Sequence, residues 1–293
     1  MGLKSLEIQL SIYDESTFLV DELVPELINS FQGLEHLGFT NDSSPQTLDV
    51  WRALKQHKST LKSFVHHQRD LVSEPGFVHE LDIYDLSLKS LESQLRAWQE
   101  EPSENPLNHL DLEFFGICCH PCIFTGLVLD SMMTSISLRI LHIRQSGVDI
   151  KHTPSWGQNV KMRCWKIWDF DDADLAHKDG FEPLAARDLY CHLEEGFEQL
   201  CQEAFGPWGI ASLELLAFGD FSHDRGYLQT NMVFVRNEEY VRQSDAEDYK
   251  RPTMSSERTF RFIRRGDRRQ HHLLEKYAYA LAACPTESIL DPS

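Results

Sequence analysis

The chain has few basic residues and no long apolar run. Its 293 residues include 28 Lys and Arg against 46 Asp and Glu, which gives a formal net charge of −18. Such a surface repels phosphate groups on average, so we expect neither nucleic acid nor an anionic membrane as a partner. The longest stretch without a formal charge, residues 114–129, is shorter than the roughly 20 apolar residues that cross a bilayer. The sequence therefore predicts no membrane-spanning helix.

Secretion signals are also missing. The amino-terminal residues lack the continuous apolar segment and the small-residue cleavage site of a secreted protein. The seven cysteines are an odd number spread through a long chain, which fits reduced thiols better than a disulfide framework. We expect an intracellular protein, either cytoplasmic or nuclear.

The motifs of common enzymes are absent. The sequence has no Gly-x-Ser-x-Gly nucleophile turn, no Gly-x-x-x-x-Gly-Lys-Ser/Thr phosphate loop and no Gly-x-Gly-x-x-Gly dinucleotide fingerprint. Ser222, His223 and Asp224 have the residue types of a hydrolase triad, but neighbours in sequence do not ordinarily converge on one reacting atom. We therefore expect no catalytic activity and no cofactor.

One short segment holds four soft metal ligands. These are Cys118, Cys119, His120 and Cys122. A structural zinc site needs a second cluster of this kind, and the sequence does not supply one. Buried thiols in a tight turn are the preferred interpretation, and a metal site is the weaker alternative.

What the sequence does contain is a recurring Leu-x-x-Leu-x-Leu frame. It starts at Leu3, Leu34, Leu61, Leu107, Leu138 and Leu213. The last position of the frame is Leu, Ile or Phe in five frames, and the polar His66 occupies it in the third. Each frame predicts a short strand whose alternate side chains point into a core. Between frames the spacing of apolar residues is helical, as at Leu48, Trp51 and Leu54 after the N-cap Ser44.

These alternating elements predict an α/β solenoid, with a parallel sheet and outer helices, over residues 1–236. A long gap between frames predicts an insertion at about 151–207, which includes an amphipathic helix that ends before Gly206-Pro207. Residues 237–293 are expected to form a polar loop and a carboxyl-terminal helix.

Three segments carry a family resemblance. Residues 31–37, 57–62 and 209–221 resemble the degenerate leucine-rich repeats of filamentous-fungal F-box-like proteins. The resemblance implies a repeat solenoid that selects a substrate protein. In that family an amino-terminal F-box docks on the Skp1 adaptor of a cullin ubiquitin ligase. No F-box is recognised in this sequence, so Skp1 and cullin are expected partners only if an F-box lies upstream.

If the frames stack in register, the residues between the core leucines form columns on the concave face of the sheet. The polar members of these columns are the predicted binding residues. They are His36, His67, His109, Asp111, Glu113, His142 and Arg144. The stacking would place Asp111 beside His142 and Glu113 beside Arg144, so that opposite charges link adjacent strands.

The predicted function is a protein-interaction scaffold that binds an unidentified protein partner through this face. A solvated sheet face with chance charge pairs is an equal alternative, because exposed ion pairs contribute only about 0–1 kcal/mol. From a different class, a hydrolase or metal-dependent enzyme with a site between the repeats and the insertion remains open.

Overall fold

A computed structural model of the chain describes residues 3–10, 17–42, 47–69, 95–119, 121–144, 195–219, 221, 232–238, 258–263 and 268–282. These residues form one sheet of eight strands that lie side by side in the order of the sequence. The strands are β1 (Ser5–Gln9), β2 (His36–Asp42), β3 (Ser63–Arg69), β4 (Phe114–Ile117), β5 (Ile140–Arg144), β6 (Leu215–Gly219), β7 (Met232–Arg236) and β8 (Phe260–Phe262). Strands β1 to β6 pair in parallel, whereas β7 and β8 pair antiparallel. The predicted α/β class is confirmed.

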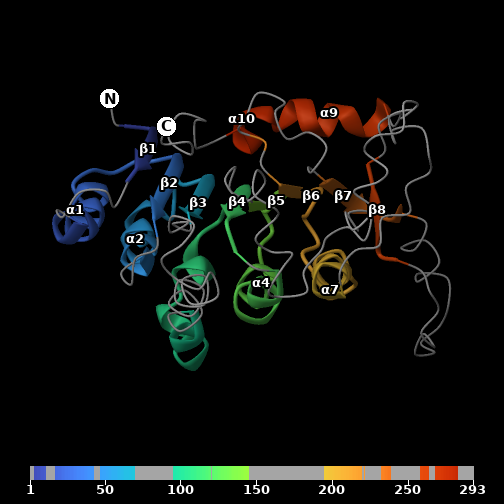
Figure 1. Cartoon of the computed structure of the whole chain (residues 1–293), viewed down its shortest axis with the longest axis horizontal. Coiled ribbons are helices and arrows are strands. Elements are labelled where there is room, and N and C mark those ends of the chain that lie inside the picture. The colour runs from blue at the N-terminus through green and yellow to red at the C-terminus, as the bar shows by residue number, and fades with distance from the viewer. Residues whose placement is uncertain are drawn as a thin grey trace, which may run out of the picture.

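Helices connect the strands. They are α1 (Thr17–Asn29), α2 (Thr47–Ala53), η1 (Leu54–His57), η2 (Pro102–Glu104), η3 (Pro106–His109), α4 (Pro121–Leu127), α5 (Leu129–Met132) and α7 (Glu195–Ala204), with α9 (Arg268–Lys276) and α10 (Ala278–Leu281) after the last strand. Residues 95–100 are also helical. Figure 1 shows α1, α2, α4 and α7 along one face of the sheet, and α9 and α10 along the other.

The face toward α2 and α4 carries the larger core. Phe64 and Phe115 are partners on neighbouring strands, so both side chains point to the same side of the sheet. Trp51 of α2 is fully buried against them, with its ring centroid 5.5 Å from Phe64 and 5.8 Å from Phe115. Fully burying a phenylalanine stabilises a fold by about 1.5–3 kcal/mol, so this aromatic group is a major source of stability.

The opposite face carries a second core under the carboxyl-terminal helices. Val65, Phe114, Ile140 and Leu215 form an apolar band across the sheet and are buried together with Tyr277. The sheet is therefore covered on both sides where this band lies.

The strand register confirms five of the six predicted frames. His36 pairs with Ser5 and Ser63, and Ile140 pairs with Leu215, as the stacked frames predict. The fourth frame is wrong, because Phe114 is the residue that continues this row between β3 and β5. The working frame starts at Leu112 and not at Leu107.

Local turn chemistry explains the error in the fourth frame. Asn105 Oδ1 accepts a 3.0 Å hydrogen bond from the Leu107 amide, and Pro106 occupies the first position of η3. Both features favour a helical turn over a strand. Leu107 and Leu112 are both buried, so apolar spacing alone fits either frame.

Only parts of the insertion and of the carboxyl-terminal segment belong to the described residues. Of the predicted insertion at about 151–207, α7 and the turn at Gly206 are described, and α7 ends at Ala204 as its apolar pattern predicts. Most of the polar loop that was expected after residue 236 lies outside the described residues. Within the described ranges, no helix combines the length and the apolar character that crossing a bilayer requires.

Candidate functional site

The face predicted to bind a partner is covered over its amino-end half by α9 and α10. Tyr279 lies against His36, with ring centroids 6.1 Å apart. The Tyr277 hydroxyl donates a 3.1 Å hydrogen bond to Glu214 Oε2, and Lys276 Nζ lies 3.3 Å from the same oxygen. Burial raises the pKa of Tyr277, which keeps this hydroxyl a donor. A partner would have to displace these helices to reach the strands beneath them.

Three of the predicted binding residues meet in a buried polar cluster at the carboxyl ends of the strands. His67, His142 and Arg144 are all fully buried. Arg144 Nε donates to His67 Nδ1 over 3.1 Å, and Arg144 Nη1 lies 3.5 Å from His142 Nδ1. His142 Nε2 lies 2.8 Å from the carbonyl oxygen of Gly219, so it is the protonated nitrogen of that ring. Both imidazoles thus present an unprotonated Nδ1 to the guanidinium.

The predicted placement of Asp111 and Glu113 on this face is wrong. Gly116 is the residue of β4 that lies beside His142, because the fourth frame is shifted. Asp111 and Glu113 both precede β4 and are exposed. Neither predicted pair, Asp111 with His142 or Glu113 with Arg144, is formed by the strand register.

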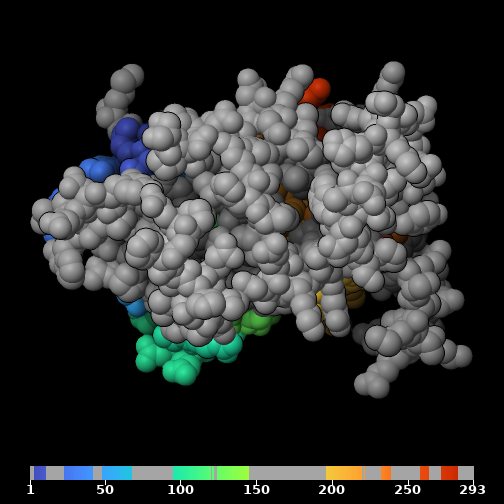
Figure 2. All heavy atoms as spheres, viewed as in Figure 1, coloured from blue at the N-terminus to red at the C-terminus, as the bar shows by residue number. Residues whose placement is uncertain are grey.

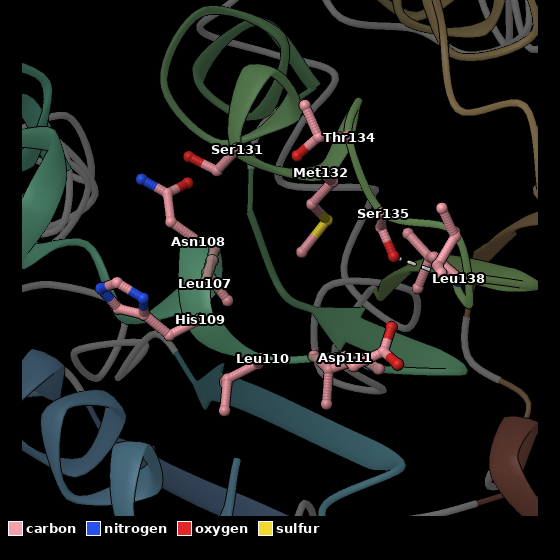
Figure 3. A pocket seen from close by; sticks show the side chains of 12 residues that line it. Leu107, Asn108, His109, Leu110, Asp111, Ser131, Met132, Thr134, Ser135 and Leu138 are labelled. Carbon is pink, nitrogen blue, oxygen red and sulfur yellow. Dashed lines mark hydrogen bonds between the residues drawn. The ribbon is translucent and has the colours of Figure 1, made fainter. Parts of the chain in front are cut away.

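Asp111 and His109 instead line a hollow of about 220 Å³. One wall comes from η3 and the residues after it, and the other from α5 and the turn before β5 (Figure 3). The Met132 side chain points into the hollow between these walls. Asn105 Nδ2 donates a 2.7 Å hydrogen bond to Ser131 Oγ, which ties the two walls together. The sequence places His109 on the sheet, and the structure places it in this wall.

Two large apolar side chains are exposed at the same edge of the sheet as the hollow. Ile136, in the hollow's lining, is 80% exposed, and Trp208 is 84% exposed. Trp208 stands in the turn before β6 and Ile136 in the turn before β5. Ser212 Oγ joins these two turns through hydrogen bonds to the carbonyl oxygens of Ser135 and Leu138, at 3.0 and 2.9 Å. Figure 2 shows that the blue-green part of the chain around residues 95–110 also reaches the surface at the lower edge of the molecule.

A row of alternating charge runs along the amino ends of the parallel strands. It consists of the residues that directly precede β1 to β6, which are Lys4, Glu35, Lys62, Glu113, Arg139 and Glu214. Glu35 binds both cationic neighbours, with Nζ–Oε distances of 2.5 Å to Lys4 and 3.0 Å to Lys62. The last pair, Arg139 and Glu214, is 3.9 Å apart. We refer to these six residues as the charge row.

The charge row shifts the ionisation of its members. The hydrogen bond from Lys4, followed by that from Lys62, lowers the pKa of Glu35 to about 2. The hydrogen bond with Glu35 raises the pKa of Lys62, and the charge of Glu113 acts in the same direction. Both groups therefore stay charged over the physiological range.

The cysteine segment lies at the junction between β4 and α4. Cys118 is partly exposed and Cys119 is buried. The expectation of buried thiols holds for Cys119 and not for Cys118. His120 and the side chain of Cys122 lie outside the described residues. In the part of the chain that is described, no three His, Cys, Asp or Glu side chains converge on a common point that could hold a metal ion.

Sequence reasoning missed the charge row, although its signal is visible once the fourth frame is corrected. Each frame's first leucine is followed by a charged residue, and the sign of that charge alternates from unit to unit.

No protein-family model, no curated protein and no solved structure matches the chain at a significant level.

Proposed function

We propose that the chain is a degenerate leucine-rich-repeat solenoid that works as a protein-interaction scaffold. Its partner binds at the edge formed by the amino ends of β4 to β6, where Ile136, Trp208 and the hollow lie. The exposed tryptophan at this edge is the observation that carries the proposal. In this proposal the edge, and not the face of the sheet, is the main binding surface, because α9 and α10 cover much of that face.

The order of the strands supports a repeat solenoid. A doubly wound α/β sheet reverses its strand order and carries helices on both faces. Here β1 to β6 follow one another without reversal, and the helices between them lie on one face (Figure 1). Stacked strand–helix units that contact only their neighbours produce this arrangement.

The chemistry of the edge indicates the kind of partner. Exposed tryptophan is enriched among the residues that dominate binding energy at protein interfaces, and an adjacent hollow can accept an apolar side chain. Asp111 lines the hollow, and Glu113 and Asp130 are exposed beside lining residues in the sequence. A partner segment with an apolar anchor flanked by Lys or Arg complements this edge in shape and charge.

The family resemblance suggests a more specific role. In this more specific proposal, the chain is the substrate-recognition part of an F-box-type ubiquitin ligase, and an F-box links it to Skp1 and cullin. The edge at Trp208 would then select the substrate.

Affinity capture from the source cell with matched variants tests the proposal. Trp208→Ser and Ile136→Ser should each lose partners that wild type retains, because both remove exposed apolar surface from the edge. Leu23→Ser is the control, since Leu23 is 54% exposed on α1 at the other end of the sheet. Skp1 and cullin among the retained proteins would support the ligase version. Identical protein sets from wild type, the edge variants and the control would contradict binding at this edge.

A further inference from the structure

Helix α1 carries two rows of apolar side chains, and one of them is half exposed. Val24 and Ile28 are buried in the larger core, at 5% and 0% exposure, where α1 contacts α2. Leu23 and Leu27 each come one residue earlier, so they form a second row about 100° around the helix. They are 54% and 47% exposed. Figure 1 shows α1 at the end of the row of helices, next to α2.

The first strand–helix unit differs in this respect from the units that follow it. In α2 the described apolar side chains are all buried, namely Leu48, Val50, Trp51 and Ala53. Leu3, which leads the first frame, is 46% exposed, whereas the leading leucines of the next five parallel units are at most 3% exposed. These are Leu34, Leu61, Leu112, Leu138 and Leu213. Solenoid units bury one another's apolar surface, so the exposure at Leu3, Leu23 and Leu27 belongs to the outer face of an end unit.

The carboxyl end of α1 is fixed on η1. His57 Nε2 lies 3.0 Å from the carbonyl oxygen of Ile28, and Gln56 Nε2 donates a 3.0 Å hydrogen bond to the carbonyl oxygen of Phe31. Because Ile28 is held in this way on the buried side, Leu27 stays on the outer side. A preformed apolar row of this kind needs little ordering when it binds a partner.

Charge indicates what fits this row. Helix α1 contains Asp21, Glu22 and Glu26 and no Lys or Arg. A second copy of α1 would bring like charges together, which is unfavourable. A helix that carries aliphatic side chains flanked by Lys or Arg matches both the apolar row and the charge. Such a helix would also continue the helix-on-helix packing that α1 makes with α2.

We propose that Leu23 and Leu27 of α1 form a docking surface for a basic amphipathic helix of a partner protein. The partner helix buries its aliphatic side chains on these two leucines and places Lys or Arg next to Glu26. This surface lies at the β1 end of the sheet and is separate from the proposed edge at Trp208. Partners of that edge do not contact Leu23, so they stay bound to the Leu23→Ser variant.

Two synthetic amphipathic peptides test the proposal by fluorescence anisotropy. One is built from Leu and Lys, and the other has Glu in place of every Lys. The full-length chain carries Trp208→Ser and Ile136→Ser in every peptide measurement, so that the proposed edge does not contribute. We expect this background to bind the Leu–Lys peptide and to bind the Leu–Glu peptide at least about tenfold more weakly.

Further substitutions in this background locate the binding. Leu23→Ser together with Leu27→Ser should weaken binding of the Leu–Lys peptide at least about tenfold, because both remove apolar surface from the row. Glu26→Lys keeps both leucines and should also weaken it. Tyr279→Ser is the matched control, since Tyr279 is 58% exposed on α10, and it should leave the affinity unchanged.

Three results would overturn the proposal. The first is no binding of the Leu–Lys peptide, or equal binding of both peptides. The second is an affinity for the Leu–Lys peptide that the substitutions at Leu23 and Leu27 leave unchanged. The third comes from sedimentation equilibrium of the wild-type chain: a dimer that the same two substitutions abolish would show that a second copy of the chain occupies the row.

Discussion

Lys62 Nζ lies 3.0 Å from Glu35 Oε2, which links the amino ends of β2 and β3 by an ion pair. Glu35 also binds Lys4 on the preceding unit, so one carboxylate joins three adjacent strand–helix units. Within the charge row, Glu35 is therefore paired with the cation on each side of it.

Glu35→Gln should remove stability that depends on pH. The pKa of Glu35 is lowered from 4.5 to about 2, so the unfolded chain takes up this proton first as the pH falls. Its contribution is present above about pH 4.5 and is lost between about 4.5 and 2. We expect wild type to melt at a higher temperature than the variant at pH 6, with a difference that shrinks toward pH 2 and at high salt. Calorimetry at several pH values measures this, and a constant difference would contradict it.

His66 should make the stability of the fold decrease on acidification at pH values above those at which Glu35 acts. Its ring is fully buried, with Nδ1 accepting from Trp51 Nε1 at 3.2 Å and Nε2 lying 3.0 Å from Asn41 Oδ1. Burial lowers its pKa from 6.5 to about 3, so between these pH values the unfolded chain binds this proton and the folded chain does not. The free energy of unfolding should therefore fall by about 1.4 kcal/mol for each unit by which the pH is lowered in this range.

His66→Phe provides the comparison for that titration. The variant cannot protonate at this position, but it leaves the Trp51 and Asn41 groups without the imidazole, which costs about 1–3 kcal/mol at pH 7. Urea unfolding at pH 7, 6 and 5 should therefore give a higher free energy of unfolding for wild type than for the variant at pH 7. This difference should become smaller as the pH falls. A difference that stays unchanged would refute the assignment of His66 as the titrating group.

Leu281→Ala should weaken the packing of the carboxyl-terminal helices on the sheet. Leu281 is 3% exposed in the second core with Tyr277 and the apolar band. Truncating a buried leucine costs about 2–5 kcal/mol, and dye binding to exposed apolar surface should rise at the same time. His272→Ala, at an exposed position of α9, is the control and should change little. Equal stability of the two variants would show that the helices do not pack as described.

Asn105→Ala should remove the hydrogen bond between the two walls of the hollow without unfolding the sheet. Asn105 is 4% exposed, and its side chain both caps η3 and bonds to Ser131 on the other wall. Loss of such a cap costs about 0.5–2 kcal/mol, and Ser131→Ala in the same background should add little further cost because its partner is already gone. A double-mutant cycle by chemical denaturation measures this coupling. Fully additive effects would argue against the bond between the walls.

The apolar frame predicted most of the sheet because the leading leucine of the units from β2 to β6 is buried, as at Leu34, Leu138 and Leu213. It failed at the fourth strand, where Leu107, Leu110 and Leu112 are all buried and spacing cannot choose between them. The sign of the charge after the first leucine would have chosen correctly, since Glu113 continues the alternation and Asn108 does not.

The covered face has a similar explanation. In the wrong register the column beside Ser63 contains His109 and looks polar, which favours an exposed binding face. In the observed register the same column contains Phe114, Ile140 and Leu215, an apolar band that needs a cover. The sequence could not show which segment supplies the cover, because that contact joins residues far apart in the chain.

The alternation of the charge row has a consequence for how the number of units can change in evolution. Loss or duplication of a single unit between β1 and β6 would bring two like charges together, as Glu35 and Glu113 would meet if the unit of Lys62 were deleted. Loss or duplication of two consecutive units preserves every opposite-charge neighbour. The row therefore favours an array that grows and shrinks in pairs of units.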